Sequence, residues 1–138
     1  MSESDFPAEF WQGIQQFNQG EFYECHDTLE AIWIEASEPQ KTFYQGILQL
    51  AVAIYHLGNH NLRGATILVG EAISRLSRYQ PNYAGIDVIG LLDESQTLLR
   101  QLQQATLENV NLPQLLQEGA LQYPKISLLE TSENSDNL

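Results

Sequence analysis

The chain has 138 residues, a length that favours one globular domain around a single core. Eighteen acidic residues against six basic ones give a formal net charge of −12, so the sequence lacks the basic surface that binds phosphate groups, which disfavours direct nucleic-acid binding. A single cysteine excludes an intramolecular disulfide, and the acidic N-terminus and the lack of a long apolar run predict a cytoplasmic protein that does not bind a membrane.

The N-terminal part of the sequence predicts two helices separated by a short break. Pro7 suits the first turn of a helix, and apolar residues at helical spacing then predict a helix over about 7–18. Gly20 interrupts this pattern. A second apolar stripe predicts an amphipathic helix over about 21–36. Cys25 falls on this stripe, which indicates a buried thiol that packs as a small hydrophobic side chain.

Residues 40–57 are apolar almost all the way round a helix, which predicts a buried central helix. Gly58 ends this pattern, and residues 62–76 then predict a fourth helix with small residues that permit close packing. The aromatic residues of these segments are predicted to lie in the core: Trp11, Trp33, Phe43, Tyr44 and Tyr55.

The last part of the chain predicts one further helix and an extension. Residues 80–85 form a predicted loop, and Asp87 is a plausible N-cap for a helix that continues to about residue 106. Beyond that point Pro113 and Pro124 interrupt the periodicity. We therefore expect a single helical domain over 1–106, followed by an extension over 107–138 whose acidic end, 130–138, is disordered.

Short connections between successive helices imply that neighbours in sequence pack antiparallel. The predicted fold is all-α: a compact bundle of about five helices, built from two antiparallel helical hairpins and a closing helix.

A polar cluster is predicted between the second and third helices. His26 and Glu30 are four residues apart and share one helical surface. On the third helix, Gln45, Gln49 and His56 fall within one narrow strip. In an antiparallel hairpin that turns near residue 38, Glu30 would lie level with Gly46 and Gln49, and Gly46 would leave room beside its carboxylate. We expect this cluster to be buried in the hairpin.

Two interpretations of this cluster stay open. The side chains could form a structural hydrogen-bond network that sets the register of the hairpin. Alternatively, they could form a ligand-binding site, with the candidate residues His26, Glu30, Gln45, Gln49 and His56. Two histidines and one carboxylate, His26, Glu30 and His56, could also hold a divalent metal such as zinc, iron or manganese, although their spacing matches no common metal motif.

The segment from Asn18 to Trp33, N-x-G-x-F-Y-E-x-H-D-x-x-E-x-x-W, and the later run Q-G-I-L-Q-L-A at 45–51 resemble the uncharacterised helical family numbered 309 among the domains of unknown function. The resemblance covers roughly residues 8–79. It implies a compact helical bundle without an established activity, whose polar signature includes His26, Glu30 and Gln49. A weaker likeness to tetratricopeptide repeats extends only to the helical hairpin, because the two similar segments lie 40 residues apart instead of 34.

The leading functional hypothesis is a non-enzymatic module that binds a small ligand or a metal through the His/Glu/Gln cluster. One alternative is a metal-dependent, hydrolase-like enzyme in which His26, Glu30 and His56 leave a position open for water. A second alternative is a scaffold that binds another protein through the outer face of a helical hairpin. A small molecule, another protein and a second copy of the chain all remain open as partners.

Overall fold

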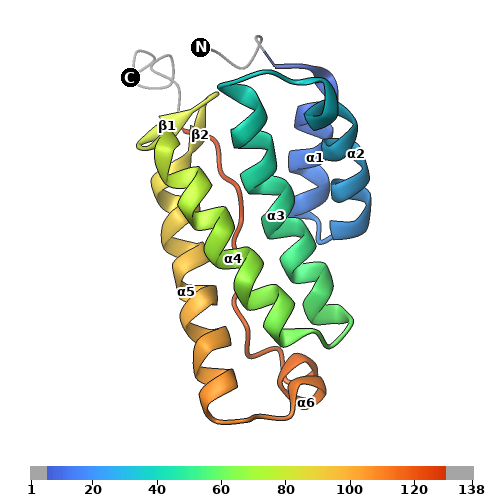
Figure 1. Cartoon of the computed structure of the whole chain (residues 1–138), viewed down its shortest axis with the longest axis vertical. Coiled ribbons are helices and arrows are strands. Elements are labelled where there is room, and N and C mark those ends of the chain that lie inside the picture. The colour runs from blue at the N-terminus through green and yellow to red at the C-terminus, as the bar shows by residue number, and fades with distance from the viewer. Residues whose placement is uncertain (1–5, 130–138) are drawn as a thin grey trace, which may run out of the picture.

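The computed structural model describes residues 6–129 and is predominantly helical in that range (Figure 1). The six α-helices of this range are α1 (Ala8–Asn18), α2 (Phe22–Glu35), α3 (Gln40–Gly58), α4 (Leu62–Leu76), α5 (Val88–Leu107) and α6 (Leu112–Gln117). A 3-10 turn, η2 (Ser77–Tyr79), follows α4. The predicted all-α fold is confirmed, with one addition: the loop after η2 contains a two-stranded hairpin, β1 (Asn82–Tyr83) and β2 (Ile86–Asp87).

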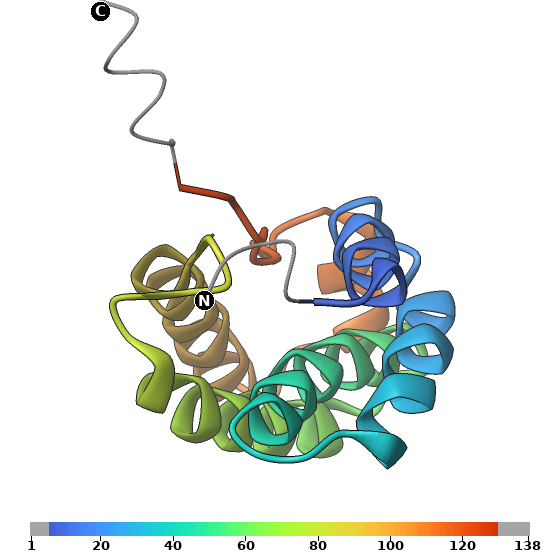
Figure 2. The ribbon, with the colours of Figure 1, turned by 90° about the horizontal axis from the view of Figure 1, so that it is seen from above.

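Helices that follow one another in sequence also pack against one another. The contacts run from α1 to α2, α3, α4 and α5 in turn, and those between α3 and α4 are the most extensive. Seen from above, these five helices follow an arc (Figure 2). The two hairpins and the closing helix α5 are therefore present as predicted, and α3 is the central helix with neighbours on both sides.

The ends of the helices follow local capping signals. Asp87 caps α5 as predicted, since its carboxylate accepts a hydrogen bond of 2.9 Å from the Gly90 N–H. Asn111 caps α6 in the same way at the Gln114 N–H, and Pro113 lies in the first turn, where its missing N–H is not needed. The helix α6 was not predicted from the sequence, because six residues are too short to show a helical period.

After α6 the chain runs through the gap between α1 and α5 (Figures 1 and 2). The Asn18 side chain holds this segment by its backbone: its Nδ2 donates to the Ile126 carbonyl and its Oδ1 accepts from the Ile126 N–H, both at 2.8 Å. Further along, the Asp87 N–H donates to the Ser127 carbonyl and the Leu129 N–H to the Gly85 carbonyl. Ile126 is buried. The segment up to residue 129 is therefore fixed to the helices, and the predicted acidic tail, 130–138, lies outside the described residues.

The predicted core is largely confirmed. Phe43, Tyr44 and Cys25 are buried, while Trp11 and Trp33 are partly buried and pack against the core. Tyr55 was predicted wrongly, because 42% of its surface is exposed. It lies near the end of α3, where its ring packs against that of Tyr23 on α2. Among residues 6–129, no helix has both the length and the apolar character that a bilayer span requires.

Candidate functional site

His26 and Glu30 meet on α2, at the edge of its contact with α3. The distance from His26 Nε2 to Glu30 Oε2 is 3.2 Å, and His26 Nδ1 lies 3.3 Å from Asp27 Oδ1. The side chains of His26 and Glu30 are 31% and 47% exposed. The predicted proximity is confirmed, but the prediction that this pair is buried inside the hairpin was wrong. Its position at the edge of the α2–α3 contact leaves both groups in reach of water.

Gln49 does not join His26 and Glu30. It is 8% exposed and faces α4, where its Nε2 donates to Glu71 at 3.0 Å and its Oε1 accepts from Arg75 at 3.2 Å. Gln45 is half-buried four residues earlier, on the same side of α3. The predicted cluster is therefore divided, because α3 packs between two helices: Gln49 faces α4, whereas His56 lies on the side of α2.

Gly46 also serves the contact with α4. A Cβ atom added at this position would lie 2.7 Å from Cγ of the buried Leu76. The space that the sequence analysis assigned to the Glu30 carboxylate is thus occupied by a leucine side chain. Close approach of α3 to α4 explains a glycine in the middle of a long helix better than a polar site does.

His26 and His56 do come together, around a small cavity of about 190 Å³ whose wall is completed by Tyr23, Val52 and Tyr55. His60, at the end of α3, is exposed and has a φ of 60°. Within residues 6–129, no group of three or more His, Cys, Asp or Glu side chains could hold a metal ion. The metal-ligand set His26, Glu30 and His56 therefore remains a prediction from the sequence, because the described residues do not bring these three side chains together as a metal-binding group.

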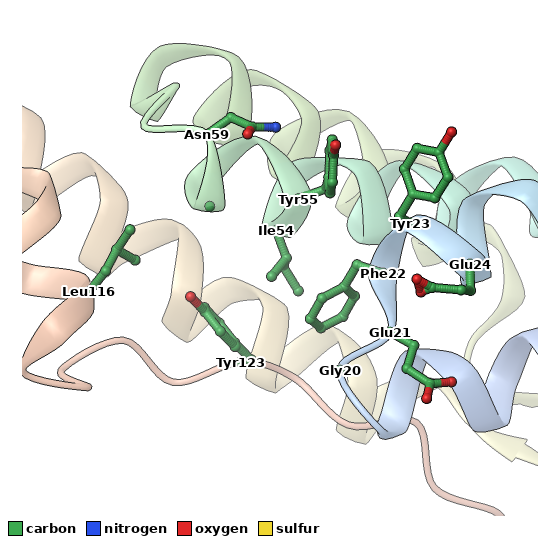
Figure 3. A pocket seen from close by; sticks show the side chains of 11 residues that line it. Gly20, Glu21, Phe22, Tyr23, Glu24, Ile54, Tyr55, Asn59, Leu116 and Tyr123 are labelled. Atoms are coloured by element: carbon green, nitrogen blue, oxygen red, sulfur yellow. The ribbon is translucent and has the colours of Figure 1, made fainter.

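A larger cavity adjoins this one, and Tyr23 and Tyr55 line both. We call it the aromatic groove; it has a volume of about 520 Å³ and lies where the start of α2 meets the end of α3, with α6 and the C-terminal segment opposite (Figure 3). Its lining residues are Gly20, Glu21, Phe22, Tyr23, Glu24, Ile54, Tyr55, Gly58, Asn59, Leu116 and Tyr123.

Four aromatic rings line the groove: Phe22, Tyr23, Tyr55 and Tyr123. The ring centroids of Phe22 and Tyr123 are 6.2 Å apart with the planes nearly perpendicular, and those of Tyr23 and Tyr55 are 5.6 Å apart. Burial raises the pKa of Tyr123, so its hydroxyl stays protonated at neutral pH and can donate a hydrogen bond. Two exposed carboxylates, Glu21 and Glu24, stand at one end. The groove can therefore hold a small molecule through aromatic contacts and a few polar groups.

Sequence reasoning missed most of this groove. Tyr55 was placed in the core, and Tyr123 follows the point at which the helical pattern ends. The signal that could have found part of it is the pair Tyr23 and Tyr55: the same antiparallel register that places His56 opposite residues 20–22 also brings these two rings together. Nothing local in the sequence connects Leu116 and Tyr123 to the start of α2.

Comparison with known proteins finds a family match over most of α1, all of α2 and α3, and the start of α4. Residues 10–68 match the model of a family described as a domain of unknown function (DUF309). This part of the chain is therefore similar to DUF309 domains. The resemblance seen in the sequence is thus confirmed. The matched region supplies the α2 and α3 walls of the aromatic groove, whereas Leu116 and Tyr123 lie outside it.

Two curated bacterial proteins are also similar. One stretch of 91 residues, 65% of the chain, is 33% identical to the uncharacterized protein YpuF of Bacillus subtilis (strain 168) and covers 49% of that protein. A second stretch of 73 residues, 52% of the chain, is 28% identical to an uncharacterized protein of Aquifex aeolicus (strain VF5) and covers 22% of that protein. The chain thus spans about half or less of these curated relatives.

Proposed function

We propose that this protein is a non-enzymatic module that binds a small ligand in the aromatic groove. The observation that carries the proposal is a cavity of about 520 Å³ whose aromatic side chains come from three separate parts of the chain: Phe22 and Tyr23, Tyr55, and Tyr123. Small-molecule sites commonly have volumes of roughly 300–1,000 Å³ and combine apolar walls with a few polar groups. This proposal keeps the ligand-binding function predicted from the sequence and assigns it to the aromatic groove instead of the His/Glu/Gln cluster.

The far wall of the groove is held in place by the body of the protein. On either side of Tyr123, the Gln122 N–H donates to Gln101 Oε1 and the Lys125 N–H to Glu94 Oε1, both at 3.0 Å. Both acceptors belong to α5. This anchoring supports a groove that exists before a ligand arrives, which lowers the entropic cost of binding.

The chemistry of nearby side chains favours binding over catalysis. Cys25, the only thiol of the chain, follows Glu24 directly but is buried, and this burial raises its pKa to about 12. The reactive thiolate is therefore scarce at neutral pH. His26 and His56 lie in the adjoining small cavity and could contact the end of a ligand that extends past Tyr23 and Tyr55.

A pair of glycine substitutions tests the proposal. Gly58 lines the groove at the end of α3, and a Cβ added there meets no heavy atom within 4 Å, so Gly58→Leu adds bulk to the groove wall without a core clash. Gly70→Leu is the matched control, since Gly70 has equally open surroundings on α4 and lines none of the cavities described above.

The measurement is ligand-observed NMR with a library of small aromatic and aliphatic fragments, followed by amide shift mapping on the labelled full chain. We expect fragments that shift the signals of Tyr55, Asn59 and Tyr123, that lose binding in Gly58→Leu and that keep it in Gly70→Leu. Fragments that bind both variants equally, or a library without a single hit at these residues, would overturn the proposal.

A further inference from the structure

We infer that the aromatic groove selects an organic cation: an ammonium group, primary or quaternary, on a small apolar body. This inference rests on the proposed function and adds the chemical class of the ligand. It depends on three features of the groove: the sign of its charged groups, the orientation of the two helix ends that meet there, and the accessibility of its aromatic rings.

The charged groups of the groove are all negative. Glu21 and Glu24 are among its lining residues, which include no Lys, Arg or His. In Figure 3 the Glu24 side chain extends toward the Phe22 ring, whereas the carboxylate of Glu21 points away from the groove. Glu24 is therefore the residue that we assign to pair with a cation, with Glu21 adding to the negative potential. A phosphate or carboxylate ligand would be repelled by both.

The two helix ends at the groove carry partial charges of opposite sign. The start of α2 would by itself attract an anion, because the first N–H groups of a helix carry partial positive charge. Here Glu21 and Glu24 stand in that same turn, and their negative charges offset it. The opposite wall is the end of α3 at Gly58 and Asn59, where the last carbonyl groups carry partial negative charge. The α3 wall thus favours a positive ligand, and on the α2 wall the two carboxylates outweigh the opposing partial charge of roughly half a unit at the helix start.

The aromatic rings offer faces that a cation can contact. Tyr23, Tyr55 and Tyr123 are 54%, 42% and 38% exposed, and Phe22 is partly buried beside them. The planes of Phe22 and Tyr123 meet at 86° in an edge-to-face contact, so the two rings do not stack face to face. An ammonium group within about 6 Å of such a ring is attracted by the negative charge on its face. Neutral apolar ligands gain the same contact area without this attraction.

Two probes of nearly equal shape separate charge from shape: choline and its neutral analogue 3,3-dimethyl-1-butanol, in which carbon replaces the ammonium nitrogen. We expect choline to bind the full chain about tenfold more tightly, by amide shift titration. Glu24→Gln should weaken choline by roughly three- to tenfold and leave the alcohol unchanged. Glu35→Gln, an equal loss of charge at the far end of α2, is the control and should change choline binding little, since it lies outside the groove.

The outcomes distinguish this inference from the proposed function. Equal affinity for choline and the alcohol, with both lost in Gly58→Leu, would overturn cation selection and leave the groove as a ligand site. If neither choline nor the alcohol binds while library fragments still lose binding in Gly58→Leu, cation selection is likewise overturned and the groove is again left as a ligand site. If choline binds but Glu24→Gln and Glu35→Gln weaken it equally, the acidic surface as a whole attracts it and the inference is wrong. Failure of fragments and probes alike would remove both proposals.

Discussion

Two neighbouring regions of the chain are polar parts of one sequence motif but have different surroundings: the end of α1 at Asn18, and the exposed edge of α2 at His26 and Glu30. Asn18 is partly buried and binds both backbone groups of Ile126, which is 108 residues away in sequence. His26 and Glu30 bind each other across one helical turn, with 31% and 47% of their side chains exposed. The first contact joins distant parts of the fold, whereas the second is local and accessible to water.

The difference shows that residues of one polar sequence motif can have separate structural roles. A buried polar group that loses its partner carries the full desolvation penalty, while an exposed pair that is broken can turn to water. We therefore expect the stability of the protein to depend on the C-terminal segment that Asn18 binds at Ile126, and to be almost independent of the His26–Glu30 pair. The four predictions below test this expectation, from the largest effect to the smallest.

Truncation after Lys125 should have the largest effect. It removes the buried Ile126 and the backbone pairing of residues 127–129 with the β1–β2 hairpin, so the free energy of unfolding should fall by about 2–5 kcal/mol in a chemical denaturation experiment. Truncation after Leu129 is the control, and we expect it to change stability by less than about 0.5 kcal/mol. Equal losses in the two truncations would mean that the docked segment contributes nothing of its own.

Asn18→Ala should cost about 1–3 kcal/mol, because it leaves the N–H and the carbonyl of Ile126 without their side-chain partners. The same substitution in the chain truncated after Lys125 should cost much less, since the partner is already missing. A double-mutant cycle by urea denaturation measures this coupling. Additive losses would contradict the assignment of Asn18 as the anchor of the C-terminal segment.

Gln49→Ala should cost about 0.5–1.5 kcal/mol. Its side chain is buried between α3 and α4, but its partners Glu71 and Arg75 are 48% and 31% exposed and can recover hydrogen bonds from water. Gln45→Ala makes the same change in helix propensity four residues earlier and serves as the control. In thermal melts, the losses of stability caused by Gln49→Ala and His26→Ala should add, because Gln49 contacts α4 and His26 lies on α2. Coupling between the two losses would support the single cluster predicted from the sequence.

His26→Ala and Glu30→Gln should each change the free energy of unfolding by less than about 0.5 kcal/mol, because the pair is exposed and lies within one helix. Melting curves at neutral pH are sufficient to measure this. A loss of about 1–3 kcal/mol for either variant would show that the pair is buried in solution, as the sequence analysis expected.

The sequence by itself determined the five longer helices, α1 to α5, and their antiparallel order, because helical periodicity and capping are local properties. Asp87 illustrates this, since its role as N-cap follows from its place before an apolar stripe. The same periodicity placed His26 beside Glu30 correctly, because residues four apart on a helix are neighbours whatever surrounds them.

Only the tertiary structure decided which neighbour each helical face meets. A helical wheel shows that Gln49 and Gly46 share a side of α3 with small or polar residues, but it cannot say whether α2 or α4 packs there, and the answer is α4. Likewise the aromatic groove needs Tyr123 beside Phe22, two residues about a hundred positions apart that meet because Asn18 and the β1–β2 hairpin direct the C-terminal segment between α1 and α5. Such contacts depend on the packing of the whole chain, which local pattern does not encode.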